Sequence, residues 1–469
     1  MSVQSSKRYD VAILGGGSGG YVAAVRAAQL GLKVAVVEEE KVGGTCLHRG
    51  CIPTKALLQS AAMLDQIGHA ARLGVNAGEV SFDYAKASAN KKDVVTRLWR
   101  GVEYLLKKNT VDTVAGRGRL DGPGRITVAG KEGDREISAR HVILATGSRP
   151  RTLPGLEVDG RHVLTSDEAL TLDHVPRSAV ILGAGAIGVE FASLYRSLGG
   201  EVTLVEVAER LVPLEDHEVG AELQKQFEAR GIRCLPGTRL LTESLEHTEG
   251  GIAVSVERGG EEERLEAEVL LVAVGRAANT EDIGLEGTGV IVDRGVIQVD
   301  GTMRTGEDGV LAVGDVVGGF WLAHKAMHEG VVAAEAIAGR KPHPIDPRLV
   351  PRTTYCNPQI GSIGLSEREA AEAGMEVRTG VFPFRGNGRA LIWGEPSGLC
   401  KVVADAGTDS VVGVHIIGHE VTELIAGPAL GMLLEATPFE LSRAIAPHPT
   451  LSEVLGEAAL AVSGEAIHL

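Results

Sequence analysis

Residues 9–20 read YDVAILGGGSGG, and this stretch decides the fold of the first part of the chain. A short run of residues that favour β-strands leads directly into Gly15, Gly17 and Gly20, which have the spacing GxGxxG. In a dinucleotide-binding βαβ unit, such glycines let the backbone approach a pyrophosphate, and the N-terminus of the following helix stabilises its charge. The stretch therefore predicts a strand, a tight glycine turn and a helix.

The residues that follow complete such a unit. The alanine-rich segment 21–30 predicts the helix, and the apolar segment 33–37 predicts a second strand. Glu38 stands at the end of this strand, where a carboxylate can accept a hydrogen bond from a ribose hydroxyl. A lone GxGxxG is weak evidence in a chain with 62 glycines, but strand, helix, second strand and acid in this order are strong evidence.

The same construction occurs a second time. Residues 178–188 read SAVILGAGAIG and repeat the spacing at Gly183, Gly185 and Gly188. A predicted helix and strand follow, and the strand ends at Glu206, which lies 23 residues after the first glycine, as in the first unit. A carboxylate here would repel a 2′-phosphate and accept a hydrogen bond from a free 2′-hydroxyl, so Glu206 favours NAD over NADP.

The similarity between the two units extends further along the chain. Residues 140–147, RHVILATG, are similar to residues 267–275, AEVLLVAVG, and each segment follows a polar stretch that predicts a β-hairpin. Two matches in register indicate an internal repeat. The chain therefore contains two dinucleotide-binding units.

The pattern changes in the last third of the chain. Residues 310–315, VLAVGD, predict a strand that ends in Gly-Asp, and residues 323–338 predict a helix. Residues 339–347 carry three prolines, so they cannot form a regular helix and indicate a domain boundary. Alternating runs at 398–404 and 411–417 then predict an antiparallel sheet. The expected fold class is α/β, with two Rossmann-like dinucleotide-binding domains and a C-terminal α+β domain.

Composition excludes several classes of protein. At 469 residues the chain has room for about three domains, and 44% hydrophobic with 23% charged residues excludes wholesale disorder. The net charge of −15 opposes non-specific binding to nucleic acid or anionic lipid. No apolar stretch is long enough to span a bilayer, and the N-terminus lacks the apolar core of a secretory signal. We expect a cytoplasmic protein without a nucleic-acid or membrane partner.

Two of the five cysteines differ from the others. Cys234, Cys356 and Cys400 stand alone and are expected to be small buried apolar residues. Only four residues separate Cys46 from Cys51, and no second Cys/His cluster lies nearby to complete a zinc site, so no metal is expected. A paired redox function is the sharper interpretation of these two residues, and two unreactive core thiols are the alternative.

Two further segments carry a family resemblance. Residues 43–57, GGTCLHRGCIPTKAL, together with residues 447–453, PHPTLSE, resemble the redox-active disulfide motif and the C-terminal motif of the pyridine nucleotide-disulfide oxidoreductases. The resemblance runs from Gly15 to Glu453. It implies an FAD-binding domain over 1–150, an NAD-binding domain over 151–275, a central region over 276–347 that completes the FAD site, and a dimerisation domain over 348–469.

The resemblance also implies roles for individual residues. Those expected to bind FAD are Gly15, Gly17, Gly20, Glu38, Lys55, Thr146, Gly147 and Asp315. Those expected in the NAD site are Gly183, Gly185, Gly188, Glu190, Glu206 and Gly275. In the family, the glutamate that matches Glu190 pairs with the lysine that matches Lys55, near the reactive end of the flavin.

The chemistry of the family requires the remaining residue types. By resemblance, Cys51 lies against the flavin ring and Cys46 exchanges with the sulfur of the substrate. A base must take up protons as the disulfide opens, and His448 can do so near neutral pH while Glu453 fixes its tautomer. In the family this pair comes from the other subunit, so the active unit is expected to be a homodimer.

The substrate expected from the resemblance is dihydrolipoamide, oxidised through the Cys46–Cys51 disulfide and FAD to reduce NAD to NADH. The expected partners are the lipoyl domain of an acyltransferase or carrier protein and the acyltransferase core of a 2-oxo acid dehydrogenase complex, with the glycine cleavage system as another setting. Two departures from the family pattern are His48-Arg49, where Asn-Val is more usual, and Ala446, where a second histidine is frequent.

Two alternatives remain open. The first is another NAD(P)H-dependent disulfide reductase, similar to glutathione or mercuric reductase. Glu206 disfavours an NADP-dependent glutathione reductase, and the final residues 467–469, IHL, lack the paired cysteines that would capture mercury. The second alternative is a flavoprotein that only docks and has no turnover, for which the cysteines and His448 would be superfluous.

Overall fold

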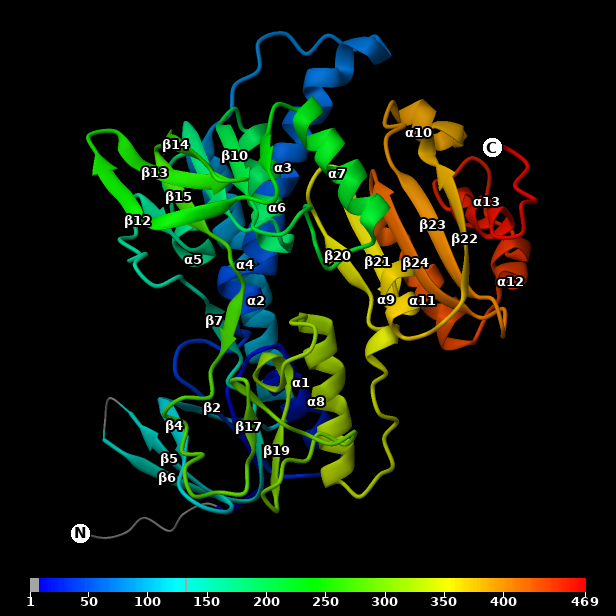
Figure 1. Cartoon of the computed structure of the whole chain (residues 1–469). Helices are drawn as coiled ribbons and strands as arrows, with labels where there is room; N and C mark the ends of the chain where they lie inside the picture. Colours follow the sequence, from blue (N-terminus) through cyan, green and yellow to red (C-terminus); the bar gives the residue numbers. More distant parts are fainter. Residues whose placement is uncertain (1–7, 131–132) are drawn as a thin grey trace. The chain divides into compact units, whose positions relative to one another are not determined.

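The computed structural model describes residues 8–130 and 133–469. The chain divides into two compact units (Figure 1). The first contains the described residues up to 56 together with 88–150 and 276–345, and the second contains 57–87, 151–275 and 346–469. Each unit has a buried apolar core of its own.

The first unit is built on a largely parallel sheet with the strand order β3-β2-β1-β6, and β19 lies on the other side of β6. These strands are β1 (Arg8–Leu14), β2 (Val34–Glu38), β3 (Asp112–Ala115), β6 (Arg135–Leu144) and β19 (Val310–Ala312). An antiparallel extension continues from β6 through β5 (Arg125–Ala129) to β4 (Arg117–Leu120). Short pairs join β7 (Ser148–Pro150) to β16 (Arg276–Ala278) and β17 (Val292–Asp293) to β18 (Val296–Ile297).

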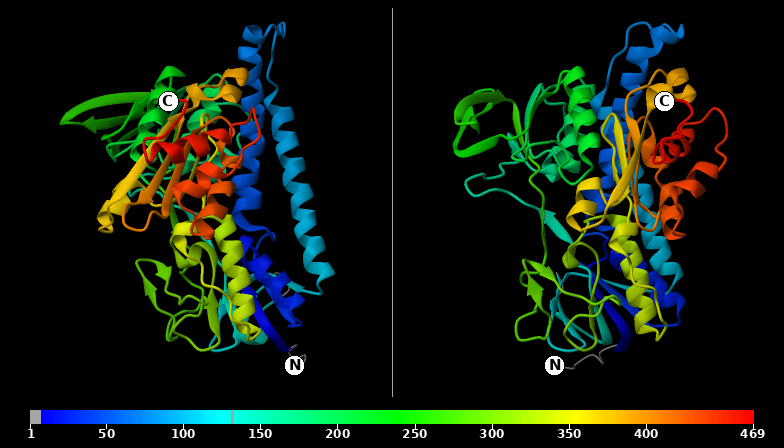
Figure 2. Two further views of the ribbon diagram at one scale, coloured as in Figure 1. Left: turned by 90° about the vertical axis from the view of Figure 1, so that its right-hand side faces the viewer. Right: turned by 45° about the vertical axis from the view of Figure 1, so that its right-hand side comes forward.

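Two helices of the first unit pack side by side, α1 (Ser18–Gln29) and α8 (Ala323–Ile337) (Figure 1, Figure 2). Glycines make this close contact possible: a Cβ on Gly330 would lie 2.5 Å from the Gly19 carbonyl oxygen, and one on Gly19 would lie 3.0 Å from the Ala326 oxygen. The contact therefore fixes the position of α8 along α1. The other helices that begin in residues of this unit or end in them are α2 (Gly44–Arg49), α3 (Cys51–His69) and α4 (Tyr84–Lys108).

The second unit repeats the parallel arrangement. Its sheet has the order β11-β10-β9-β15-β8, with all neighbours parallel. The strands are β8 (Val163–Leu164), β9 (Ser178–Leu182), β10 (Glu201–Val205), β11 (Arg233–Leu235) and β15 (Val269–Val272), with helices α5 (Ser166–Ala169), α6 (Ala186–Ser197) and α7 (His217–Ala229). The hairpin sheet that precedes β15 consists of β12 (Arg239–Thr248), β13 (Gly251–Arg258) and β14 (Glu261–Ala267).

The last part of the second unit is an antiparallel sheet of order β20-β21-β24-β23-β22. Its strands are β20 (Arg352–Thr354), β21 (Gln359–Gly364), β22 (Val377–Pro383), β23 (Leu399–Asp405) and β24 (Val411–Gly418). The helices around it are α9 (Glu367–Glu372), α10 (Gly388–Trp393), α11 (Ala426–Leu433), α12 (Pro438–Arg443) and α13 (Glu453–Ala461). A Cβ on Gly380 of β22 would lie 2.2 Å from the Ala458 oxygen, so glycine is needed where α13 packs on the sheet.

A row of buried polar side chains crosses this sheet. Arg352, Ser362, His415 and Lys401 stand directly opposite one another on β20, β21, β24 and β23. The Lys401 ammonium lies 3.2 Å from an oxygen of Asp216, the N-cap of α7, and 2.8 Å from Glu367 of α9. The row thus connects the sheet to α7 and α9 through charges.

The structure confirms the predicted fold class and most predicted elements. The first helix begins three residues before the predicted segment because the glycine-rich stretch 18–20 is itself helical. Segment 339–346 contains no helix or strand, as its prolines predict. Across residues 8–130 and 133–469, no helix combines the length and the apolarity needed to cross a bilayer.

Candidate functional site

The first glycine turn contains two packed glycines and one open glycine. A Cβ on Gly15 would lie 2.3 Å from the Ala145 oxygen, and one on Gly20 would lie 2.0 Å from the Gly15 oxygen. A Cβ on Gly17, the N-cap of α1, would meet only the Gly44 Cα among the described residues, at 3.8 Å. The outer glycines thus serve packing, and the middle one leaves space at a helix N-terminus that has no side-chain cap.

The second turn has the same division. A Cβ on Gly183 would lie 2.5 Å from the Ala273 oxygen, and one on Gly188 would lie 1.8 Å from the Gly183 oxygen. Gly185, the N-cap of α6, has no atom of the described residues within 4 Å of its Cβ position. Both turns therefore have the shape and the uncapped helix N-terminus that a dinucleotide pyrophosphate requires.

An acidic side chain lies against each turn. Glu38 accepts hydrogen bonds from the backbone N–H of Gly16 at 2.7 Å and of Glu40 at 2.9 Å. Glu206 accepts them from Ala184 at 2.6 Å and Ala208 at 2.8 Å. The structure thus places both predicted ribose-binding acids at equivalent positions beside their glycine turns.

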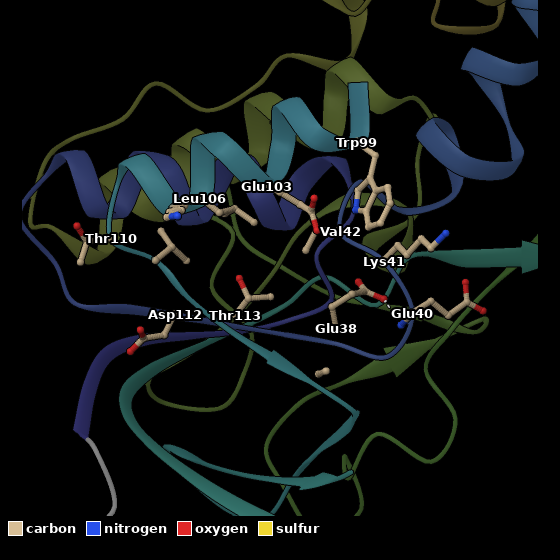
Figure 3. Close-up of a pocket in the computed structure, with 13 residues that line it drawn as sticks. Glu38, Glu40, Lys41, Val42, Trp99, Glu103, Leu106, Thr110, Asp112 and Thr113 are labelled. Atoms are coloured by element: carbon tan, nitrogen blue, oxygen red, sulfur yellow. Dashed lines mark hydrogen bonds between the residues drawn. The ribbon is translucent and has the colours of Figure 1, made fainter. Parts of the chain in front are cut away.

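A cavity of about 440 Å³ adjoins Glu38 (Figure 3). The end of β2, the following loop, the second half of α4 and the start of β3 line it. The Lys41 ammonium lies 4.6 Å from the centre of the Trp99 ring. Figure 3 shows these two side chains next to each other in the lining of the cavity. Because it opens beside the predicted ribose acid, this cavity has the position that the adenosine half of a dinucleotide would need.

Three further predicted FAD residues of the first unit, Thr146, Gly147 and Asp315, form hydrogen bonds with residues on and around the paired strands β7 and β16. The Thr146 hydroxyl donates to the backbone carbonyl oxygen of Asn279 at 2.7 Å, and Asn279 Nδ2 donates to the backbone carbonyl oxygen of Thr146 at 2.9 Å. Gly147, with φ +70°, accepts from the Asn279 N–H at 2.9 Å. Asp315 accepts from the Ser148 hydroxyl, whose oxygen in turn accepts from Arg276 Nε at 2.7 Å.

Cys46 and Cys51 form a disulfide in the structure, with their Cα atoms 4.7 Å apart. Cys46 lies within α2 and Cys51 begins α3, so Gly50 makes the break between the two helices. A Cβ on Gly50 would lie 3.0 Å from the Thr45 oxygen, tighter than an ordinary contact. Lys55 lies one turn further along α3. The prediction of a redox-capable pair is thus supported by the bond itself.

The two unusual residues between the cysteines contact the loop after β2. His48 Nε2 lies 2.9 Å from the Val42 oxygen, and its ring meets the edge of Trp99 with centroids 6.2 Å apart. Arg49 forms an ion pair with Glu40. Both side chains therefore contact the segment that also lines the cavity.

The three other cysteines, Cys234, Cys356 and Cys400, are buried as expected. Burial raises the pKa of both Cys234 and Cys400 to about 12. Thiols with such pKa values stay protonated near neutral pH, which is typical of inert core residues.

Glu190 and Gly275 belong to the second unit. The Glu190 side chain is buried and accepts a hydrogen bond from the Tyr355 N–H at 2.9 Å. Gly275 has φ +108°, and within the described part of the chain no atom lies within 4 Å of its Cβ position. Lys55 lies in the first unit, so its pairing with Glu190 stays a prediction.

His448 and Glu453 form the predicted pair. His448 Nδ1 lies 2.8 Å from Glu453 Oε1, and the Thr450 N–H donates to Glu453 Oε2 at 2.9 Å. Partial burial acts to raise the pKa of Glu453, but the hydrogen bonds from His448 and Thr450 outweigh it and lower that pKa. The His448 side chain is 80% exposed, so its other nitrogen, Nε2, can exchange a proton with a substrate. Its action on the disulfide stays a prediction, because the disulfide belongs to the first unit.

Several residues at these sites carry no sequence signal. Ser148 and Arg276 are 128 residues apart, and Asn279 lies 133 residues from Thr146. Tyr355 lies 165 residues from Glu190 and contributes only its backbone N–H. Their roles depend on tertiary contacts, which no local motif indicates.

Similarity to known proteins extends over nearly the whole chain. The family model described as pyridine nucleotide-disulphide oxidoreductase matches residues 9–330, and the dimerisation domain of the same family matches residues 350–459. A dihydrolipoyl dehydrogenase of Bacillus subtilis is 49% identical over 98% of this chain and 99% of its own length. One from Rhizobium etli is 45% identical over 99% of this chain and 100% of its own length.

Two solved structures are also similar to this chain over nearly its whole length. The crystal structure of LpdA from Mycobacterium tuberculosis is 30% identical, covers 97% of this chain and 99% of that one, and has a TM-score of 0.88. The HOCl-induced flavoprotein disulfide reductase RclA of Escherichia coli is 26% identical, with coverages of 97% and 99% and a TM-score of 0.85.

Proposed function

The chain belongs to the pyridine nucleotide-disulphide oxidoreductase family, and we propose from this that it is an NAD-dependent dihydrolipoyl dehydrogenase. The observation that carries the proposal is the Cys46–Cys51 disulfide, which follows a glycine turn open to a dinucleotide. The full-length similarity to dihydrolipoyl dehydrogenases supports the choice of substrate.

FAD belongs in the first unit and NAD in the second. Glu38 and the cavity beside it would hold the adenosine half of FAD, and Thr146, Gly147 and Asp315 would hold the rest of the molecule. Glu206 at the second turn selects NAD by accepting from a ribose hydroxyl and repelling a 2′-phosphate. FAD, when bound, would supply a two-electron acceptor for the reduced Cys46–Cys51 pair, and NAD⁺ would be the final acceptor of these electrons as a hydride.

The protein residues perform the thiol chemistry. His448 Nε2 accepts the proton of one substrate thiol, and Glu453, bonded to Nδ1, stabilises the imidazolium that forms. The substrate thiolate attacks Cys46 Sγ, so that a mixed disulfide forms and the Cys46–Cys51 bond breaks with both of its electrons on Cys51. The second substrate thiol then attacks the substrate sulfur of the mixed disulfide, which closes the cyclic disulfide product and breaks the bond to Cys46. Cys46 leaves with both electrons of that bond and takes up the proton of the second thiol.

The active form is a homodimer in which each subunit supplies His448 to the disulfide of the other. The dimerisation domain over 350–459 supports self-association. So do exposed apolar side chains on and beside α11 and α12, which are Leu430, Leu433, Leu434, Phe439 and Ile445.

The partner that presents substrate is a lipoyl domain of a 2-oxo acid dehydrogenase or glycine cleavage complex. The cytoplasmic location and the domain boundaries at 150, 275 and 347 stay predictions.

A steady-state assay tests the function. Purified protein should reduce NAD⁺ with dihydrolipoamide and prefer NADH to NADPH in the reverse direction. Glutathione disulfide with NADPH is the competing substrate pair, and faster turnover of that pair would overturn the proposal. His448→Ala should lower lipoamide turnover by about two to four orders of magnitude while FAD content stays unchanged.

A further inference from the structure

A buried ion pair on α8 contacts both ends of the turn that carries Asp315. The turn is the 3₁₀ segment η2, Gly314–Val317, which starts from Gly314 at φ +84° and is followed by Gly318 at φ +77°. The Gly314 N–H donates to Glu329 Oε2 at 2.7 Å, and Lys325 Nζ donates to the Gly318 oxygen at 3.0 Å. Lys325 and Glu329 also bond each other, with Nζ and Oε1 2.6 Å apart.

The burial of this pair is unusual for charges four residues apart on a helix. The side chains of Lys325 and Glu329 are only 11% and 5% exposed, whereas those of Arg368 and Glu372 on α9, also four residues apart, are 58% and 65% exposed. Burial raises the pKa of Glu329, Lys325 opposes that rise, and the nearby charge of Asp315 adds to it. Because desolvation is costly, a pair in this position must be held by its backbone contacts.

The ion pair also connects two parts of the predicted FAD site. Gly330, the residue after Glu329, packs on Gly19 of α1, so α8 is fixed against the helix that follows the first glycine turn. Within the turn itself, the Asp315 carboxylate accepts a hydrogen bond from the Ser148 hydroxyl. The pair therefore fixes the position of Asp315 relative to the N-terminus of α1.

We propose that Lys325 and Glu329 are positioning residues for FAD, which act by holding the Gly314–Gly318 turn so that Asp315 meets the bound cofactor. The inference rests on the proposed function, in that Asp315 contacts FAD. It adds two residues of α8 to the predicted FAD site, both acting through the turn that carries Asp315. Asp315 is the contact, and the ion pair sets where that contact lies.

The test measures FAD binding to the full-length chain after removal and titration of the cofactor. Glu329→Leu and Lys325→Met should each raise the Kd for FAD by about tenfold or more, as the loss of a charged hydrogen bond implies. Glu329→Gln keeps an acceptor for the Gly314 N–H and should lose less affinity than Glu329→Leu. The visible circular dichroism and the midpoint potential of the bound flavin should shift in both of the first two variants.

The matched control is Glu335→Leu on the same helix. Glu335 pairs with Arg26 of α1 but does not touch the turn, so it reports on the packing of α8 alone. This variant should keep the FAD affinity and the flavin spectrum of the parent, whatever it does to thermal stability. If Glu329→Leu, Lys325→Met and Glu335→Leu all lower the melting temperature by similar amounts and leave the Kd for FAD and the flavin spectrum unchanged, the ion pair is merely structural and the proposal fails.

A second measurement applies if Glu329→Leu or Lys325→Met folds poorly, and it uses the milder substitution Glu329→Gln. In an Asp315→Asn background, the effect of Glu329→Gln on the Kd should shrink, because the pair acts through Asp315. Fully additive effects would overturn the proposal. A parent protein that binds no FAD would instead refute the proposed function, so the two failures are distinguishable.

Discussion

At Gly185 the backbone leaves space that no atom of the described residues fills. A Cβ added here meets nothing within 4 Å, and the residue has an ordinary φ of −74°. Gly185→Val should therefore leave the fold intact while the new methyl groups obstruct a pyrophosphate. We expect the Kd for NADH to rise more than about tenfold, or about 1.4 kcal/mol, measured by titration, with an unchanged melting temperature.

The control for this variant is Gly250→Val. Gly250 also has open space around its Cβ position, but it lies in the turn between β12 and β13, away from the glycine turn. Its NADH affinity should equal that of the parent. Tight NADH binding by Gly185→Val would show that the pyrophosphate lies elsewhere.

Individual residues differ in how far the sequence predicts them. The glycines and Glu206 were predictable because a fixed spacing places them on one turn, and their contacts are local. Ser148 and Arg276 were not, because each acts only through a partner that long-range folding brings near. The same holds for Glu329, whose acceptor role toward Gly314 follows from a helix register that the sequence pattern does not determine.

At the scale of elements, the buried row across the antiparallel sheet carries charges that must stay paired. Lys401 is 1% exposed and contacts Asp216, Glu218 and Glu367. Lys401→Met leaves these carboxylates without their cation, which should destabilise the protein by about 3–5 kcal/mol in denaturant unfolding. Lys225→Met, which removes a 72% exposed lysine on α7, should change stability by no more than about 0.5 kcal/mol.

The histidine in this row makes stability depend on pH. Burial lowers the pKa of His415, the hydrogen bond with the Leu365 oxygen and the charges of Asp216 and Glu215 oppose this, and Arg352 reinforces it. The pKa of His415 in the folded state lies below the unfolded value of about 6.5. The full contribution of the neutral imidazole to the free energy of unfolding is therefore present above about pH 6.5. It falls as the pH decreases toward the folded-state pKa, by up to about 1.4 kcal/mol per pH unit.

The measurement is denaturant unfolding between pH 7 and pH 5. His415→Gln should flatten the decrease relative to the parent, whereas His247→Gln, which removes an exposed histidine, should preserve it. An equal slope in the parent and His415→Gln would contradict the assignment.

Elements were predictable where a period or a motif marks them. The βαβ units and the strands 399–405 and 411–418 follow from apolar patterns that the fold then buries. Helix α4 carries no motif, and residues 57–87 pack with the second unit although they follow the disulfide directly in sequence. That division depends on long-range packing, which outweighs proximity along the chain.

At the scale of the whole molecule, the proposed exchange of His448 between subunits predicts complementation. Cys46→Ser and His448→Ala chains should each be inactive with lipoamide. A dimer of one of each contains one site with both residues intact, so it should recover about half of the parent activity, because the two sites of a symmetric dimer are equivalent. Mixed dimers verified by two affinity tags that remain inactive would place His448 beside the disulfide of its own chain.

The two sulfurs of the disulfide are unequal because of where they lie on their helices. Cys51 is the first residue of the 19-residue helix α3, whereas Cys46 lies in the middle of the six-residue α2. The partial positive charge at the start of a long helix stabilises a thiolate, which makes Cys51 the better leaving group. A nucleophile that attacks Cys46 expels the more stable anion, and one that attacks Cys51 does not. The position of Cys51 at the start of α3 thus favours one direction of exchange before any substrate arrives.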